Sequence, residues 1–209
     1  MHTVHSHSIH EGTLIMTNSS IRFRGFTLVE LMTVLAIVGI LAATAVPSFV
    51  AAVRNARLTS AANQLVTSLN YARNEAVKRG QYVVARKTST EWESGWEVFV
   101  DTDKSNAFND DNDSTLCEAT EDCRLRLYEG LPANFTLRAN NFSTYISYRP
   151  TGESNTFGSF AICDNSDGSG IPKSRTARLV TVINTGRINQ GRDTNNDGIP
   201  DGLTSCTNP

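Results

Sequence analysis

Apolar residues dominate one uninterrupted stretch near the N-terminus. Residues 26–46 read FTLVELMTVLAIVGILAATAV and contain a single charged side chain, Glu30. A helix of this length spans about 31 Å, close to the thickness of a bilayer's hydrocarbon core. Arg22 and Arg24 precede the stretch, so the leader is expected to stay in the cytoplasm while the rest of the chain crosses the membrane.

A helical pattern resumes after Pro47. Between residues 50 and 76 apolar positions recur at steps of three and four and form one stripe, and most Arg and Asn side chains lie off it. Gly80 follows two cationic residues, which is typical of a helix end. The pattern predicts one helix over residues 26–79, with a kink or local melting near Pro47, because proline lacks a backbone donor and clashes with the preceding turn.

From Gln81 the apolar period changes to two. The alternating runs are short and are bounded by Gly, Pro, Asn and Asp, as in antiparallel sheets. The predicted strands are 81–87, 95–101, 124–128, 134–138, 144–149, 159–163 and 177–183. A long helix followed by short strands predicts an α+β domain, with the helix packed on an antiparallel β-sheet.

Composition excludes several classes of function. The four histidines all lie in the first ten residues, so a chain that loses this end has neither a Ser-His or Cys-His pair nor a His-ligated zinc site. No glycine-rich phosphate loop or internal repeat occurs. The net charge of −2 indicates no global basic field of the kind that marks a nucleic-acid binder. We therefore do not expect an enzyme.

Hydropathy alone leaves three interpretations of the apolar stretch. A secretory signal peptide would be cut at Ala43-Thr44-Ala45, but Glu30 interrupts its apolar region and helical sequence continues past the cut. A plain signal anchor leaves Glu30 unexplained, since a carboxylate at the centre of a membrane helix costs about 2.5–3.5 kcal/mol on insertion scales. The third interpretation rests on the residues around the start of the stretch.

Residues 24–30 read RGFTLVE, and they closely resemble the class III signal of type IV prepilins. In that family a prepilin peptidase cuts after the glycine and methylates the new N-terminal residue, and a glutamate at the fifth mature position pairs with a terminal amine during assembly. The resemblance implies cleavage between Gly25 and Phe26, N-methylation of Phe26, and an assembly role for Glu30. It also implies a helix kink at the positions Gly39 and Pro47.

Later segments narrow the resemblance. LNYARNEAVKR at 69–79, GWEVFVD at 95–101, YRPTG at 148–152 and NTGRI at 184–188 look like the GspH/FimT family of minor pilins and pseudopilins, in the family's order. The resemblance implies a type IV pilin-like fold. Its parts would be a prepilin leader (1–25), a transmembrane or fibre-core half of the helix (26–50) and a periplasmic globular domain (51–209).

The same resemblance implies a function. The chain is expected to be a minor pilin that primes or joins type IV pilus assembly, with a GspH-type pseudopilin of a type II secretion system as the alternative. Expected partners are other pilin or pseudopilin subunits, prepilin peptidase and the inner membrane. The chain would cross that membrane once, with its C-terminal domain in the periplasm, and then enter the fibre. No cofactor is required.

Four cysteines remain in the exported domain, an even number in an oxidising compartment. Four cysteines allow three pairings. A Cys117–Cys123 disulfide would close a short loop, and a Cys163–Cys206 disulfide would attach the C-terminal tail to a strand. Free buried thiols are the alternative, and metal ligation is disfavoured because the spacing is not CxxC.

Residues 193–201 match the first nine positions of a calcium loop, with glycine at the sixth. The ligand positions are Asp193, Asn195, Asp197, Ile199 and Asp201. Thr204 stands where an EF-hand has its bidentate Glu, so the loop resembles the shorter DxNxDGxxD loops of extracellular proteins. An ordinary turn is the alternative. A second oxygen-rich run, residues 101–113, has irregular spacing and predicts a solvated acidic loop.

Charge is segregated along the mature chain. Residues 54–87 carry seven Lys and Arg against one acid, residues 91–129 twelve acids against three Lys and Arg, and residues 130–192 seven Lys and Arg against three acids. A basic patch formed by Arg175, Arg178, Arg187 and Arg192 could face nucleic-acid phosphates.

Some FimT-type proteins are described as DNA receptors in natural transformation, with a Gly-Arg-x-Arg motif near the C-terminus. Here the match reads Gly186-Arg187-Ile188-Asn189, so the second arginine is replaced, and Arg192 follows three residues later. This departure favours a solvated or subunit-facing basic surface. A DNA-binding pilin is retained as the alternative from a different functional class.

Overall fold

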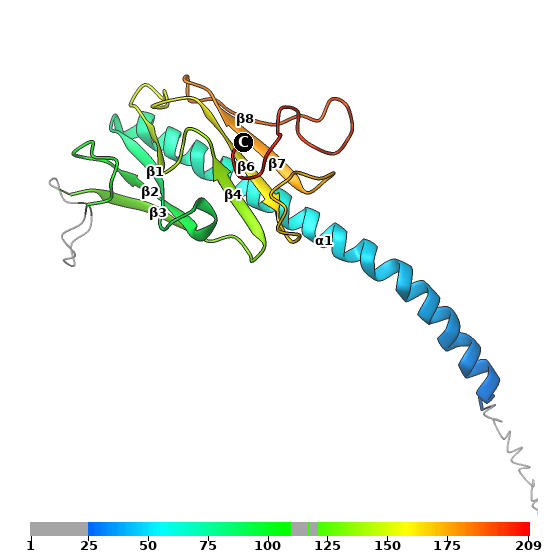
Figure 1. Cartoon of the computed structure of the whole chain (residues 1–209). Coiled ribbons are helices and arrows are strands. Elements are labelled where there is room, and N and C mark those ends of the chain that lie inside the picture. Colours follow the sequence, from blue (N-terminus) through cyan, green and yellow to red (C-terminus); the bar gives the residue numbers. More distant parts are fainter. Residues whose placement is uncertain (1–24, 110–116, 118–120) are drawn as a thin grey trace, which may run out of the picture. The chain divides into compact units, whose positions relative to one another are not determined.

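The computed structural model describes residues 25–109, 117 and 121–209, which form one long helix and two antiparallel sheets (Figure 1). The elements are α1 (Leu28–Arg79), β1 (Val83–Lys87), the 3₁₀ turn η1 (Trp92–Ser94), β2 (Gly95–Val100), β3 (Cys123–Glu129), β4 (Phe135–Ala139), β5 (Tyr145–Tyr148), β6 (Gly158–Asp164), β7 (Ala177–Val182) and β8 (Ile188–Gln190). The chain divides into two compact units, one up to Ala45 and one over Val46–Pro209.

Local sequence accounts for both ends of α1. The Thr27 hydroxyl oxygen accepts a hydrogen bond from the Glu30 backbone N–H at 3.2 Å, as an N-cap does. At the other end, Gly80 adopts a φ of 66° and donates its N–H to the Ala76 carbonyl at 3.0 Å. The helix continues without interruption through Pro47, so local melting there is wrong. A proline forfeits only one intrahelical bond, and the long helix on either side tolerates that loss.

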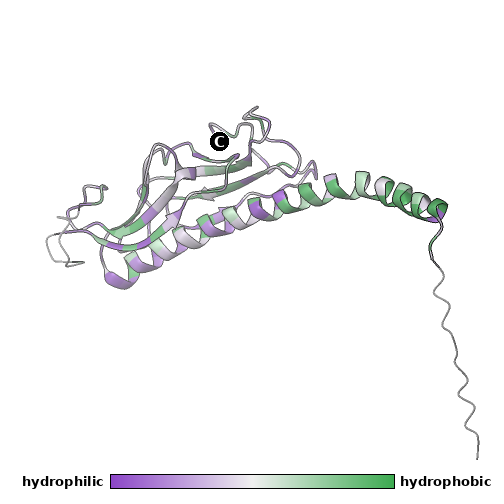
Figure 2. Cartoon of the chain, turned by 90° about the horizontal axis from the view of Figure 1, so that it is seen from below, coloured by the Kyte–Doolittle hydropathy of each residue, from purple (hydrophilic) through white to green (hydrophobic). Residues whose placement is uncertain are grey.

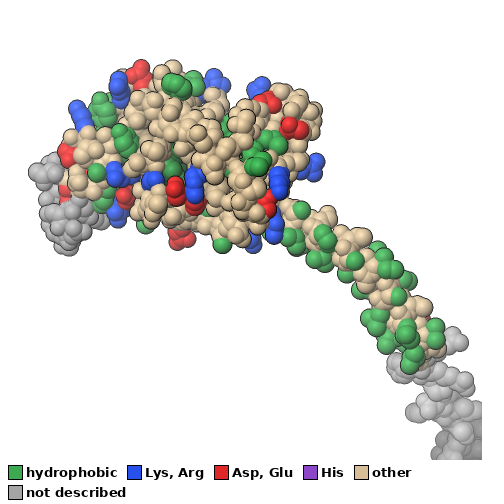
Figure 3. Space-filling model, in the orientation of Figure 1, with side chains coloured by type: hydrophobic (Ala, Val, Ile, Leu, Met, Phe, Trp, Pro, Cys, Tyr) green, Lys and Arg blue, Asp and Glu red, His purple; other side chains and the backbone are tan. Residues whose placement is uncertain are grey.

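The two halves of α1 have different surfaces. Every residue from 25 to 52 is exposed, and apolar side chains cover this stretch (Figures 2 and 3). From Leu58 onwards one face of the helix is buried. The fully buried apolar residues on that face are Leu58, Leu65, Leu69, Ala72 and Ala76. Their steps of three, four and seven follow the helical period, and the alanines let the sheets approach the helix closely.

The strands form two four-stranded sheets, in the orders β3-β2-β1-β5 and β4-β6-β7-β8. All seven predicted strands are present, with ends shifted by at most two residues, and the helix with antiparallel strands confirms the α+β class. The short β8, paired with β7, and the turn η1 were not predicted. Neither has an alternating run of apolar residues long enough to mark it.

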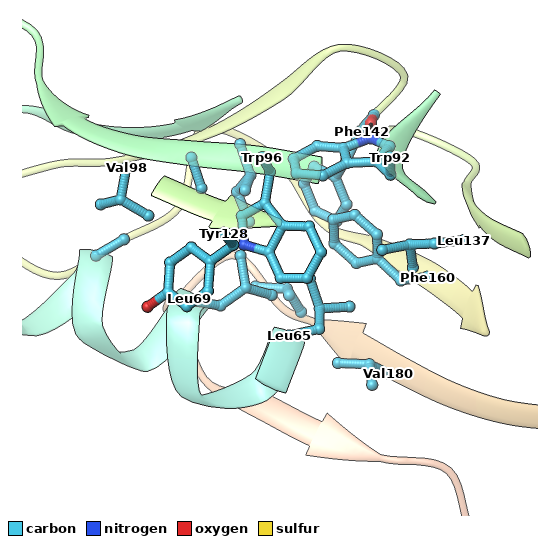
Figure 4. Packing of buried hydrophobic residues seen from close by; sticks show 14 of the residues in the cluster. Leu65, Leu69, Trp92, Trp96, Val98, Tyr128, Leu137, Phe142, Phe160 and Val180 are labelled. Carbon is cyan, nitrogen blue, oxygen red and sulfur yellow. Dashed lines mark hydrogen bonds between the residues drawn. The ribbon is translucent and has the colours of Figure 1, made fainter. Parts of the chain in front are cut away.

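Side chains from α1 and both sheets meet in one core (Figure 4). The Trp96 indole of β2 donates its N–H to the Ser68 hydroxyl on α1 at 2.9 Å and stacks on the Tyr128 ring of β3 with centroids 5.3 Å apart. The Trp92 indole of η1 donates to the Phe142 carbonyl at 2.7 Å. Both buried indoles therefore have acceptors, so neither tryptophan leaves an unpaired N–H in the core.

A smaller cluster lies on β6 and β7, where Ala161, Cys163, Ala177 and Leu179 pack against Leu203 and Cys206 of the C-terminal tail. A disulfide joins Cys163 to Cys206 and holds the tail to β6. A second disulfide joins Cys117 to Cys123 at the start of β3. Of the three possible pairings of four cysteines, the structure therefore has Cys117–Cys123 together with Cys163–Cys206.

Candidate functional site

The expected cleavage site lies just before the helix. Gly25 and Phe26 are exposed and non-helical, and the Phe26 side chain is 81% exposed. Nothing lies within 4 Å of a Cβ placed on Gly25. Within the described residues, the peptide bond between Gly25 and Phe26 is therefore exposed and outside the helix. The rest of the expected leader, residues 1–24, lies outside the described residues.

Glu30 occupies the first turn of α1. Its backbone N–H is held by Thr27, whereas its carboxylate has no ion pair or hydrogen bond within the described part of the chain. Its helical neighbours are exposed apolar residues, among them Val29 and Leu31. A carboxylate carried into lipid or into a helix bundle needs a cationic partner, because an unpaired buried charge is costly. That partner must come from outside this segment.

The apolar half of α1 is the one described segment that is long and apolar enough to cross a membrane. Eleven large apolar side chains between Phe26 and Leu41 are exposed. Gly39 lies among them, and a Cβ placed on it would meet no atom within 4 Å. Within the described chain, no neighbouring atom requires a glycine at this position. A helix of another subunit that packs closely here would explain it.

Three of the family-like segments, 69–79, 148–152 and 184–188, meet at Arg73. Its guanidinium donates Nε–H to the Gly152 carbonyl at 2.9 Å and an Nη2 hydrogen to the Thr185 carbonyl at 3.3 Å. Gly152 and Gly186 have φ of 82° and 75°, and a Cβ on Gly186 would lie 2.0 Å from the Gly152 carbonyl oxygen. Arg73 thus joins α1 to two loops that only glycines allow to pack together. Arg73 lies in a family-like segment, but no local pattern in the sequence marks it apart from the other arginines of the helix.

Two family models match the chain. The model described as Type II transport protein GspH covers residues 61–186, and the prokaryotic N-terminal methylation motif covers residues 21–46. The first spans more than half of the chain. The chain belongs to the GspH family. GspH-family proteins are structural subunits, not enzymes, and the methylation motif with its apolar helix indicates a membrane-anchored subunit.

Relatives of this GspH-family chain include two fimbrial proteins of Pseudomonas aeruginosa, each 37% identical over 75 residues, or 35% of this chain and 48% of the relative. The chain therefore spans about half the length of the curated relatives it matches. The crystal structure of the P. aeruginosa type IV minor pilin FimU matches with a TM-score of 0.50 at 23% identity, over 71% of this chain and 94% of FimU. This match shows the type IV pilin-like fold.

The minor pseudopilin EpsH from the type 2 secretion system of Vibrio cholerae is a further structural neighbour, at 14% identity and a TM-score of 0.42. The match covers 64% of this chain and 95% of EpsH.

The candidate DNA-contacting arginines of the GspH-family domain have different surroundings. Arg178 of β7 donates from its Nη2 to the Asn55 amide oxygen at 2.6 Å and to the Thr59 hydroxyl at 3.1 Å, both on α1. Burial lowers the pKa of Arg178. Its guanidinium therefore fastens the sheet to the helix and is not free for an external phosphate.

Arg187 and Arg192 are exposed but lie at opposite ends of the β7–β8 pair. The Arg187 carbonyl accepts from Ile183 beyond the end of β7, whereas Gly191, next to Arg192, donates to Leu179 near its start. At about 3.3 Å per strand residue, the two ends are roughly 13 Å apart. The hairpin thus keeps Arg187 and Arg192 apart, so these two members of the expected basic patch are not neighbours.

In the candidate calcium loop of this GspH-family chain, the side-chain oxygens accept hydrogen bonds from groups of the loop itself. Asp193 accepts from the Gly198 N–H at 2.8 Å, and Asp197 accepts from the Ile199 N–H at 2.7 Å. The Asp201 carboxylate accepts from Thr194. These hard oxygen donors suit calcium in kind, but the ion would have to replace the N–H groups as their partners.

The acidic run beginning at Asp101 departs from expectation. The Asp101 side chain accepts from the backbone N–H groups of residues 105 and 106, and Asp122 from those of residues 102 and 109. Asp101 and Asp122 are buried, and burial raises the pKa of each. A solvated loop is therefore wrong for Asp101, because its carboxylate organises the loop. The rest of the acidic run, Asp110–Asp113, lies outside the described residues.

Proposed function

We propose that this chain is a minor pilin that primes or joins type IV pilus assembly after prepilin peptidase cuts between Gly25 and Phe26 and methylates Phe26. One observation carries the proposal. The domain closes its own core, yet the preceding helix half exposes eleven large apolar side chains and a carboxylate, Glu30, that has no partner among the described residues. A subunit that is transferred from a membrane to a helical fibre core needs this division.

The magnitude supports assembly over a soluble role. Burying one large apolar side chain stabilises by about 1.5–3 kcal/mol. The eleven exposed side chains between Phe26 and Leu41 therefore represent roughly 17–33 kcal/mol that only lipid or neighbouring helices recover. Both environments are dry, so Glu30 requires a partner in each. The N-terminal amine of a neighbouring subunit, at its own Phe26, supplies the opposite charge.

We place the subunit in the inner membrane as a single-pass protein with its domain in the periplasm. Arg22 and Arg24 before the apolar span favour a cytoplasmic leader. The two disulfides, Cys117–Cys123 and Cys163–Cys206, suit an oxidising compartment. Later, the helix half from residue 26 to residue 50 enters the fibre core and the domain from residue 51 faces outward.

A pseudopilin of a type II secretion system is the second candidate. The matching family model is described as a type II transport protein, which favours this reading. The fimbrial relatives and the FimU fold favour the pilus. Both machines would use the same processed N-terminus and the same Glu30 pairing, so they differ in the fibre that the subunit joins.

We propose calcium as an accessory ligand of residues 193–201, not required for the fold. One support is the spacing of its side-chain oxygens. The other is that the loop already turns these oxygens inward, since the side chains of Asp193 and Asn195 both accept a hydrogen bond from the Asp197 N–H. Loss of the ion would leave the loop held by these same hydrogen bonds. DNA is not among the partners we propose, since the arginines expected to bind it are divided.

The test follows the native chain from membrane to fibre. Intact mass from the membrane fraction should show a protein that starts at methylated Phe26. Glu30→Ala should still be cleaved, because the cut depends on Gly25, but should be depleted from sheared surface fibres. Thr33→Ala, one turn further along the helix, is the matched control and should enter fibres normally.

A mature chain that starts at Val46 would refute prepilin processing. Equal entry of the Glu30→Ala and unmodified chains into fibres would refute the pairing role of Glu30. If deletion of the gene stops protein export and leaves surface pili intact, the pseudopilin candidate replaces the pilus.

A further inference from the structure

A groove of about 750 Å³ lies within the unit Val46–Pro209, between the first turns of its helix and the loop that follows β6. Its helical wall is mainly apolar and includes Val46, Pro47 and Val50. The opposite wall carries Asp164 and Arg175. The groove therefore combines an apolar surface with charged side chains, at the point where the apolar span of the chain ends.

The balance of charge at this groove is positive. Arg54 lines it and lies 4.0 Å from Asp164, with half of its side chain exposed. Arg175 lines the other side, and Arg57 follows Arg54 on the helix. Within the described residues, neither Arg57 nor Arg175 has an ion pair, a side-chain hydrogen bond or an aromatic partner. Among the residues that line the groove, Asp164 is the one carboxylate, against the two guanidinium groups of Arg54 and Arg175. Figure 3 shows Lys and Arg side chains where α1 enters the domain.

The depth of these residues along the helix fits a membrane surface. If residues 26–46 fill the hydrocarbon core, Val46 lies at its boundary, and each headgroup layer is about 5–8 Å thick. Val50 is then about 6 Å beyond the boundary and Arg54 about 12 Å beyond it. Long arginine side chains extend back toward the headgroups while their stems stay on apolar surface. The groove therefore spans the headgroup layer.

We propose that this groove binds the headgroup of an anionic phospholipid, with its phosphate held by Arg54 and Arg175 and its glycerol and upper acyl chains against Val46 and Val50. The inference rests on the proposed membrane anchoring. A lipid is favoured over the helix of a second copy on grounds of charge. The apolar segment of a second copy carries a single charge, Glu30. Any other part of that segment, placed in the groove, would offer Arg54 and Arg175 no anionic partner.

The test uses the full mature chain in phosphatidylcholine vesicles that contain spin-labelled phosphatidylglycerol or spin-labelled phosphatidylcholine. The fraction of each label that is motionally restricted gives its relative association with the protein. An arginine near an anionic membrane surface contributes about fivefold in binding. We expect several-fold preference for phosphatidylglycerol, reduced by up to about fivefold for each arginine in Arg54→Gln/Arg175→Gln.

Three controls make the result specific. Arg54→Lys/Arg175→Lys keeps the charge and should keep most of the preference. Arg149→Gln/Arg187→Gln removes two exposed arginines near the Arg73 junction, away from the groove, and should keep all of it. Equal association of both lipids with the unmodified chain, or a preference that survives in Arg54→Gln/Arg175→Gln, would overturn the proposal.

Two further readouts separate the possible failures. All variants should float with vesicles, since residues 26–46 are unchanged, and an unmodified chain that fails to float would refute the membrane anchoring itself. A photoreactive amino acid in place of Val50 should yield an adduct with the mass of a phospholipid. An adduct with a second protein chain in its place would overturn the lipid as occupant.

Discussion

Replacing Arg73 by methionine removes the guanidinium that joins α1 to two loops and keeps an apolar side chain of similar length. Its two acceptors differ in their access to water. The Gly152 carbonyl belongs to a buried residue, whereas Thr185 is exposed and can turn to solvent. The loss at Gly152 therefore decides the effect, because a buried acceptor without a donor retains its full desolvation penalty.

A hydrogen bond to a charged donor contributes about 1.5–3 kcal/mol to the free energy of unfolding. For a domain of this size, each kcal/mol changes Tm by about 2–4 °C. Arg73→Met should therefore lower Tm by roughly 3–12 °C. Arg149→Met is the matched control, since Arg149 lies in the same family-like segment as Gly152 but makes an exposed ion pair with Glu153 at 3.9 Å. It should cost less than about 1 kcal/mol.

Thermal unfolding followed by far-UV circular dichroism measures both variants in a fragment of residues 51–209, which keeps every core residue of the helix, the first being Leu58. Gly186→Ala should destabilise the same junction, because its new Cβ would collide with the Gly152 carbonyl. In the double variant the effects of Arg73→Met and Gly186→Ala should not add. Equal losses in Arg73→Met and Arg149→Met, or full additivity in the double variant, would refute the junction.

Three further predictions concern the tail, the calcium loop and DNA. Cys206→Ser should release the C-terminal tail to limited proteolysis and cost on the order of 4 kcal/mol, because the bridge closes a long loop; an unchanged digestion pattern would contradict this. The 51–209 fragment should melt higher in millimolar calcium than in chelator, by up to roughly 2.7 kcal/mol at a hundredfold excess over Kd, and Asp197→Ala should abolish the difference. No shift in the unmodified fragment would make the loop an ordinary turn. The same fragment should bind duplex DNA no better than about 100 μM at physiological salt, and Asn189→Arg should tighten binding. Micromolar, salt-sensitive binding without that substitution would make DNA uptake the leading function.

The elements with strong periodicity were predictable. A stripe that ends at Ala76 and a glycine at residue 80 located the end of α1, and alternating residues located seven strands. The strand β8 was missed because three residues, Ile188–Gln190, carry no period, and only pairing with β7 makes them a strand. The strand β8 therefore depends on tertiary pairing and not on local sequence.

The candidate sites were less predictable because their members are distant in sequence. Arg178 reads as a surface cation until α1 supplies Asn55 and Thr59 as its acceptors. Asp101 reads as solvated until the following loop folds over its carboxylate. Gly25 and Glu30 are the opposite case, since the cleavage and the assembly role that we propose for them depend on a short local sequence.

Both tryptophans of the chain lie in the core, Trp92 at 1% and Trp96 at 0% exposure. Residues 25–45 contain no tryptophan or tyrosine, so they add nothing to near-ultraviolet emission. Intrinsic fluorescence excited at the indole band therefore reports on the domain alone, whether the apolar helix is in detergent, bilayer or fibre. Because Trp96 touches α1 through Ser68, separation of helix from sheet would red-shift that emission. The protein thus carries its own optical probe of domain integrity during extraction from the membrane.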